Sequence, residues 1–144
     1  MELMTILAET VETSTKFTAE TERKAREIIR HIIGSAPDIT TTICSGHCHL
    51  GGIDIWAEEE ANLQGLNTLI FPPKTLSWEK GYKPRNLQIA HASDIIHCIV
   101  VKMLPPGYKG MRFTSCYHCH TDTHVKSGGC WTAKRAKQAR WWEI

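Results

Sequence analysis

The sequence lacks the features that place a chain in a membrane or mark it for secretion. Its 144 residues contain no run of about eighteen apolar residues, the length that a membrane helix needs. The first residues do not form a basic segment followed by an apolar stretch, as a secretory leader would. We therefore expect a soluble protein of the cytoplasm without a membrane partner.

The sequence also lacks internal repeats, low-complexity linkers and a strong charge of one sign. A formal net charge of +2 is too small to indicate a nucleic-acid partner. The length of 144 residues and the hydrophobic content of 42% suit a single packed core. We expect one domain that spans residues 1–144.

Helical periodicity is clearest between Thr18 and Gly34, where isoleucines recur at helical spacing. Acidic residues in the first turn and the terminal glycine fit the two ends of a helix. Further helices are expected from about Ile53 to Gly65, from Pro84 to about Ala92, and from Ala133 to about Trp142. The last of these would carry a solvated basic face.

Apolar and β-branched runs alternate with these helices and predict strands at residues 39–43, 67–71 and 95–101. Residues 5–7 could add a short edge strand. Strands that alternate with helices form βαβ units with right-handed crossovers. The sequence therefore predicts an α/β fold with a Rossmann-like, mostly parallel sheet flanked by helices.

Ligands of such sheets bind beyond the carboxyl ends of the strands. Polar or glycine-rich segments follow the predicted strands at residues 44–54, at residues 72–86 and after Val101, and we expect them to converge. Gly51-Gly52 would let backbone amides approach an anion at a helix N-terminus, or would serve only as a turn. Asp54 would repel a phosphate there, so it would bind ribose hydroxyls or cap the helix.

Two other segments offer groups for the same ligand. Arg85-Asn86 presents a guanidinium and an amide to a phosphate or a base, or is a surface arginine beside a helix cap. Trp78, in the preceding loop, could stack on a base. Ser127-Gly128-Gly129 precedes the expected C-terminal helix and forms a second glycine turn that suits an anion.

Six cysteines without a secretory leader suggest metal or redox chemistry rather than disulfides. Cys116, Cys119, His124 and Cys130 have the spacing of a structural zinc site, and the segment 116–130 would be stabilised by Zn²⁺ before the C-terminal helix. His118 and His120 are competing ligands. A redox Cys-x-x-Cys pair and the absence of any metal remain alternatives.

A second cluster of cysteine and histidine lies where the strand at 39–43 runs into the glycine loop. Its members are Cys44, His47, Cys48 and His49. They are interpreted as ligand-loop residues, with packing or a metal site as alternatives. Glu58, Glu59 and Glu60 are further acid candidates for an enzyme, but three adjacent glutamates on a helix more often form a solvated face, which is the interpretation that we favour.

A series of short motifs resembles the SLOG superfamily, which includes the Smf/DprA-like, LOG-like and YspA-related Rossmannoid nucleotide-binding proteins. The matching residues are Ser45-Gly46, Gly51-Gly52-Ile53-Asp54, Trp56-Ala57-Glu58, Phe71-Pro72-Pro73, Trp78, Arg85-Asn86, Ala90 and Ser93-Asp94, with Gly128-Gly129 and Thr132 as a second glycine signature. The resemblance implies a Rossmann-like sheet, a nucleotide-derived ligand and a homo-oligomer.

The sequence departs from the superfamily in two respects. LOG-like phosphoribohydrolases use a glutamate after the second glycine signature, and here Arg135 stands near that place. The usual N-terminal strand of the superfamily is missing or degenerate. The resemblance therefore carries the ligand class to this chain but not the hydrolase activity.

These observations favour a module that binds or senses a phosphorylated nucleoside or an ADP-ribose-type ligand. One alternative is a hydrolase that cleaves an N-glycosidic or phosphoester bond, with Asp54, His47 or His49 as general acid or base. Another is a zinc-bearing nucleic-acid-binding protein. The candidate ligand-binding residues are Ser45, Gly46, Gly51, Gly52, Asp54, Pro73, Trp78, Arg85, Asn86, Ser127, Gly128, Gly129 and Thr132.

Overall fold

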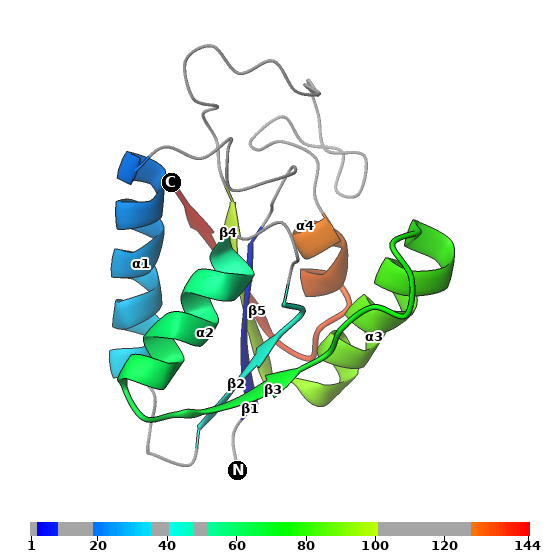
Figure 1. The fold of residues 1–144 in the computed structure, drawn as a ribbon, viewed down its shortest axis with the longest axis horizontal. Helices are drawn as coiled ribbons and strands as arrows, with labels where there is room; N and C mark the ends of the chain where they lie inside the picture. Colours follow the sequence, from blue (N-terminus) through cyan, green and yellow to red (C-terminus); the bar gives the residue numbers. More distant parts are fainter. Residues whose placement is uncertain (1–2, 9–18, 36–40, 48–51, 101–127) are drawn as a thin grey trace.

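A single parallel sheet forms the centre of the molecule (Figure 1). The computed structural model describes residues 3–8, for the backbone alone, and residues 19–35, 41–47, 52–100 and 128–144. The strands are β1 (Leu3–Ala8), β2 (Thr42–Ser45), β3 (Asn67–Ile70), β4 (Ile95–Val100) and β5 (Ala139–Glu143), in the spatial order β3-β2-β1-β4-β5. Each neighbouring pair runs parallel, which confirms the predicted parallel α/β architecture.

Strand β1 lies in the middle of the sheet, so the expectation of an edge strand was wrong. Met4 pairs with Ile43 of β2 on one side and with Ile95 of β4 on the other. A strand is therefore present near the N-terminus, although the sequence has no Gly-Ser-Arg start there. The chain first builds outward from β1 through β2 to β3 and then returns to the other side for β4 and β5, so the winding reverses between β1 and β4.

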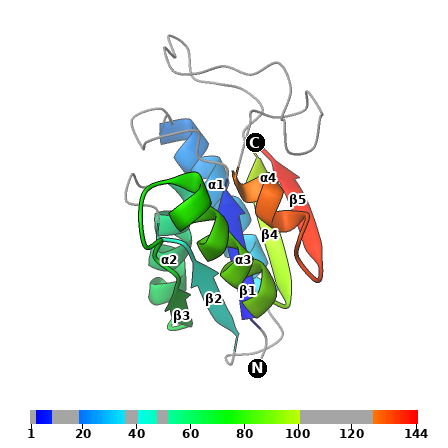
Figure 2. The same cartoon turned by 90° about the vertical axis from the view of Figure 1, so that its right-hand side faces the viewer.

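Helices cover both faces of the sheet. They are α1 (Ala19–Gly34), α2 (Ile53–Leu63), the π-helix η2 (Trp78–Tyr82), α3 (Lys83–Ala92) and α4 (Gly128–Ala133). In Figure 2, α3 and α4 lie in front of the sheet, with α1 and α2 behind it. The structure thus confirms the helices predicted at 18–34 and 53–65 and the short helix that ends near Ala92.

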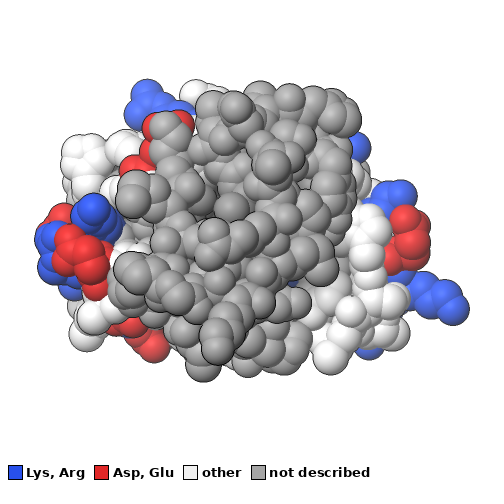
Figure 3. All heavy atoms as spheres, turned by 90° about the horizontal axis from the view of Figure 1, so that it is seen from above, with Lys and Arg blue, Asp and Glu red and all other residues white. Residues whose placement is uncertain are grey.

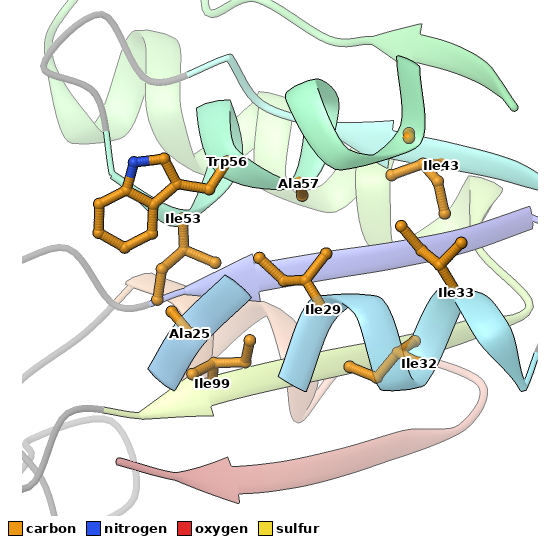
Figure 4. Packing of buried hydrophobic residues seen from close by; sticks show 10 residues of the cluster. Ala25, Ile29, Ile32, Ile33, Ile43, Ile53, Trp56, Ala57 and Ile99 are labelled. Atoms are coloured by element: carbon orange, nitrogen blue, oxygen red, sulfur yellow. The ribbon is translucent and has the colours of Figure 1, made fainter. Parts of the chain in front are cut away.

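The apolar core is divided between the two faces. On one face, isoleucines of α1 pack against Ile43, Ile53, Trp56 and Ile99, as Figure 4 shows. On the other face, Ile89 of α3 packs with alternate residues of β4 and with Ala133 of α4. Successive side chains of a strand point to opposite faces, which explains why β4 is buried along nearly its whole length.

The C-terminal segment differs from the prediction of a helix over 133–142. Helix α4 already ends at Ala133, a turn follows, and Ala139–Glu143 forms the edge strand β5 beside β4. Lys134, Arg135 and Lys137 therefore lie in that turn instead of on a helix face. Pairing with β4 and the strand preference of the Trp141-Trp142 pair outweigh the local helical pattern.

Strand β5 is anchored by a buried histidine of β4. The indole nitrogen of Trp142 donates a hydrogen bond to Nδ1 of His97 at 3.0 Å, and His31 of α1 meets the same indole edge-on at 5.8 Å. Burial, with a smaller contribution from the charge of Arg140, lowers the pKa of His97 to about 4. His97 is therefore neutral near pH 7, as the acceptor role of its Nδ1 requires.

The loop after β3 contains the π-helix, where only a polar loop had been predicted. Residues 78–82 continue directly into α3, and the Ser77 hydroxyl accepts a hydrogen bond from the Lys80 backbone. A Cβ atom on Gly81 would lie 1.8 Å from the Thr75 carbonyl oxygen, so this turn requires glycine.

Among the helices of the described ranges, none combines the length and the apolar character of a membrane-spanning segment.

Candidate ligand-binding site

The end of β2 and the start of α2 form the first part of the site. Ser45 closes the strand, Gly46 and His47 follow, and Gly52 precedes α2 with a φ of 90°. Only glycine adopts this backbone conformation readily, which accounts for one member of the predicted glycine pair. The other member, Gly51, lies outside the described residues, as do Cys48 and His49.

Arg85 ties the ends of two neighbouring strands to helix α3. Its Nη1 donates to the carbonyl oxygen of Gly46 at 2.5 Å and to that of Phe71, just after β3, at 3.3 Å. Its Nε donates to Oδ1 of Asn86 at 2.7 Å. The side chain is only 8% exposed, so the alternative of a surface arginine is wrong. A buried positive charge thus lies at the carboxyl end of the sheet.

Gly46 lies between this guanidinium and the first turn of α2. A Cβ atom at Gly46 would lie 2.2 Å from Nη1 of Arg85 and 3.2 Å from Oδ2 of Asp54. Asp54 is itself buried. Three of the predicted site residues, which come from the end of β2, from α2 and from α3, therefore lie close together.

The second part of the site is the contact between α4 and the η2–α3 segment. A Cβ atom on Gly128 would lie 3.5 Å from Nδ2 of Asn86 and 3.7 Å from the Trp78 ring. Trp78 also meets Trp131 edge-on, with ring centroids 5.2 Å apart. Because Asn86 accepts from Arg85 on one side and approaches Gly128 on the other, it links the two parts of the site.

Other predicted residues have structural contacts or lie outside the description. The Thr132 hydroxyl donates to the carbonyl oxygen of Gly128 at 2.7 Å within α4, and Gly129 is buried beside it. Pro73 lies in the partly exposed loop after β3. Ser127 lies outside the described residues, and Cys44 is fully buried in β2.

A cluster of Ser45, His47 and Glu58 lies at the same end of β2. Nδ1 of His47 is 2.8 Å from Oε1 of Glu58, and the Ser45 hydroxyl is 3.0 Å from Oε2. The Ser45 oxygen also accepts from the backbone N–H of His47 at 2.9 Å. Sequence reasoning favoured a solvated face over an acid role for Glu58, although its spacing of one helical turn from Asp54 puts both carboxylates on one side of α2.

The three glutamates of α2 do not form a uniformly solvated face, so that prediction was wrong for two of them. Glu58 faces the end of β2, whereas Glu60 is buried at the α1–α2 interface. Arg26 and Arg30 of α1 both donate hydrogen bonds to Glu60. Glu59 is exposed and pairs with Arg26.

Of the four zinc ligands predicted from the sequence, Cys130 is the one that the structure describes. Cys116, Cys119 and His124 lie outside the described residues, together with His118 and His120. Cys130 is buried in α4. In the part of the chain that the structure describes, no group of three or more His, Cys, Asp or Glu side chains could hold a metal ion.

Charges of both signs surround the end of the molecule seen in Figure 3. Described basic and acidic side chains alternate on both sides of this view, without a patch of one sign among them. Among the described residues, Arg23 and Arg26 pair with glutamates of α1 and α2. The described part of this face thus presents compensated charges.

No protein-family model, no curated protein and no solved structure matches this chain. A functional assignment therefore depends on the fold and on the side chains described above.

Proposed function

We propose that this protein binds a nucleotide-derived small molecule, a phosphorylated nucleoside or an ADP-ribose-type ligand, at the carboxyl ends of its strands. The observation that carries the proposal is the convergence at Gly46. The buried guanidinium of Arg85 and the carboxylate of Asp54 approach this residue from different elements. A cation and a hydroxyl-binding carboxylate within one small volume suit a ligand that has both phosphate and ribose groups.

The topology supports the same edge of the sheet: the site follows β2 and β3, and the winding reverses beside them, between β1 and β4. The strand order β3-β2-β1-β4-β5 corresponds to the first five strands of a Rossmann-like, doubly wound sheet. In that fold, ligands bind in the crevice outside the strand ends near the point where the winding reverses. The motifs at Ser45-Gly46, Asp54 and Arg85-Asn86, which resemble the SLOG superfamily, come from this same end of the sheet.

Each group has a chemical role in the proposal. Arg85 provides positive charge for a phosphate, and Asp54 accepts hydrogen bonds from ribose hydroxyls. Asn86 would recognise the ligand beside Gly128. Trp78 is partly exposed next to Gly128 and would stack on the base.

A structural zinc ion is part of the proposal. Thiolates of Cys116, Cys119 and Cys130 with one imidazole of His124 would complete a tetrahedral set. Since Cys130 belongs to α4, the ion would connect the preceding segment to the helix that carries Gly128 and Thr132. Elemental analysis of wild type against Cys119→Ser tests this, because zinc in the wild type must fall in the variant. Absence of zinc from both proteins would contradict the site.

A hydrolase is the second candidate function, and the contact between His47 and Glu58 favours it. A binding protein and a hydrolase would take the same class of nucleotide. Mass spectrometry distinguishes them, because only the hydrolase would release products.

Incubation of the purified protein with AMP, cyclic AMP and ADP-ribose, followed by calorimetry and mass spectrometry of the recovered small molecule, tests the binding proposal. We expect at least one of these nucleotides to bind. Trp78→Leu should weaken that binding by about tenfold or more, because base stacking on an aromatic ring contributes roughly 1–3 kcal/mol.

The matched control is Trp141→Leu, which removes an indole that is 48% exposed on the edge strand β5. This variant should bind as the wild type does. Failure of all three nucleotides to bind, or equal loss of binding in both tryptophan variants, would contradict the proposal.

A further inference from the structure

The hydrogen bond between His47 and Glu58 fixes which ring nitrogen of the imidazole carries a proton. An ionised carboxylate can only accept, so the contact of 2.8 Å requires a proton on Nδ1 of His47. In the neutral ring, Nε2 is then the free acceptor. The His47 side chain is 56% exposed, so the ring is accessible to solvent and to a ligand.

The carboxylate of Glu58 is held in place from the opposite side. Its side chain is only 13% exposed, and it projects from the rigid helix α2. The Ser45 hydroxyl donates to Oε2 at 3.0 Å, a shorter contact than its 3.4 Å approach to the Asp54 carbonyl oxygen. The same hydroxyl accepts the backbone N–H of His47, so one buried side chain orients both partners.

The backbone of His47 adopts a conformation that a side chain makes unfavourable. Its φ is 50°, and it has the sole positive φ among the non-glycine residues that the structure describes. Such conformations cost on the order of 1 kcal/mol or more, and they concentrate at functional sites. A turn that served only to connect β2 with α2 would be more stable with glycine or asparagine at this position.

The geometry points to His47 as a general base that activates water against the bound nucleotide, with Glu58 as the residue that positions it. This inference depends on the proposed ligand site, because His47 directly follows Gly46, the residue between Arg85 and Asp54. A histidine base held by a carboxylate through Nδ1 is an arrangement that supports proton transfer at Nε2.

The proton balance of the step is complete with water as the co-reactant. Nε2 of His47 takes one proton from water while the water oxygen forms a bond to the electrophilic atom of the ligand. The bond from that atom to the leaving group breaks, and the leaving group takes the electron pair. The imidazolium, which Glu58 stabilises, then returns the proton to the leaving group or to solvent.

The experiment measures binding and turnover of AMP and ADP-ribose by the full chain in the same samples. Mass spectrometry distinguishes the two possible electrophiles. Released adenine identifies the anomeric carbon, whereas adenosine with phosphate from AMP, or AMP with ribose phosphate from ADP-ribose, identifies phosphorus. We expect one of these product sets from the wild type.

His47→Asn is the main variant, because asparagine tolerates the positive φ and the fold should persist. We expect kcat to fall by roughly 10²- to 10⁴-fold, the usual contribution of a general base, while KM and nucleotide affinity stay unchanged. Glu58→Gln should lower kcat by about tenfold or more with KM unchanged. His91→Asn, which alters an exposed histidine of α3, is the matched control and should keep full activity.

A second variant separates the chemical role of His47 from a structural one. In His47→Gly the strained backbone is relieved and a space replaces the ring, so added imidazole should restore part of the lost rate. A histidine that only connected the loop to α2 would give no such rescue.

The outcomes separate this inference from the binding proposal. Bound but intact nucleotide, or full activity of His47→Asn, would overturn the catalytic role and leave the binding proposal in place. Failure of AMP, cyclic AMP and ADP-ribose alike to bind or react would overturn both. Turnover that depends on His47 and is rescued by imidazole would support both.

Discussion

Helix α2 places one buried and one partly buried glutamate in two different environments. Glu60, with 3% of its side chain exposed, faces α1 and receives hydrogen bonds from Arg26 and Arg30. Glu58, two residues earlier, faces the end of β2, where its partners are a hydroxyl and an imidazole. Among the described residues, the ion-pair partners of Glu60 are arginines that stay charged at all accessible pH values, and that of Glu58 is a titratable histidine.

The difference shows that the same type of side chain is paired with permanent charges in one place and with a hydroxyl and an imidazole in another. Burial raises the pKa of Glu60, but the hydrogen bonds and charges of Arg30 and Arg26 outweigh burial and hold that pKa below its usual value. Glu60 is therefore fixed in one charge state and connects two helices. Glu58 is connected to a ring that can accept and return a proton.

The strongest test of this comparison is to remove each carboxylate in turn. Glu60→Ala should lower the free energy of unfolding by about 3 kcal/mol, because Arg26 and Arg30 both lose a charge-assisted hydrogen bond, while Arg26 keeps Glu22 and Glu59 as partners. Glu58→Ala should cost only about 1 kcal/mol, the value of a lost hydrogen bond. Urea denaturation measures both. Equal losses in the two variants would remove the distinction between them.

The pH dependence of stability tests a second histidine. Nδ1 of His97 accepts a hydrogen bond from Trp142, whereas Nδ1 of His47 donates one to Glu58. The pKa of His97 falls from 6.5 in the unfolded chain to about 4 in the fold. As the pH falls, the unfolded chain therefore takes up the proton on His97 before the folded protein does. The contribution of neutral His97 to stability is complete above pH 6.5 and is lost as the pH falls toward 4. The loss should reach about 3 kcal/mol at pH 4.

Denaturation curves measured between pH 7 and pH 4 provide the check. The variant His97→Gln keeps an acceptor for the Trp142 indole but does not titrate, so its stability should vary less across this window. A steady decline of equal size in both proteins would assign the effect to other groups. Protonation of Glu60 adds a separate loss of stability below pH 4.5. Because the pKa of Glu60 is lower in the fold than in the unfolded chain, its contribution is complete above pH 4.5 and is lost as the pH falls through the folded pKa.

The last comparison concerns the packing of Gly46. Gly46→Ala should destabilise the protein by about 1–3 kcal/mol, because the added methyl group would displace the buried Arg85 guanidinium. The matched control is Gly34→Ala at the end of α1, where a Cβ atom meets nothing within 4 Å. Thermal unfolding should show the control at or above wild-type stability, and a loss of equal size at Gly34 would contradict the packing argument.

The sequence predicted the order of strands and helices well because these signals are local. The isoleucine spacing of α1 and the apolar run of β4 each specify their own element. The C-terminal strand was not predictable in the same way, since Lys134, Lys137 and Arg140 recur at a helix-like spacing. Only the pairing of β5 with β4 decides between a strand and a helix there.

The candidate site was predicted in part for the same reason. Gly46 could be selected as a residue at the end of a strand, and Arg85 and Asn86 as residues at the start of the following helix, but their mutual contacts depend on how α3 packs against the sheet. The roles of Glu58 and Glu60 depend on the tertiary arrangement of α2. Their spacing along the helix indicates that they point in different directions, but not which partners they meet.

The direction of β5 has a practical consequence for all of these measurements. Because β5 runs parallel to β4 and the Ile144 amide donates to the Val100 carbonyl oxygen, the last residue lies at the carboxyl edge of the sheet (Figure 1). An affinity tag attached after Ile144 would emerge at the edge where the candidate site lies and would compete with a ligand for access. A tag attached ahead of β1 would emerge at the opposite edge and is the better choice for binding and turnover assays.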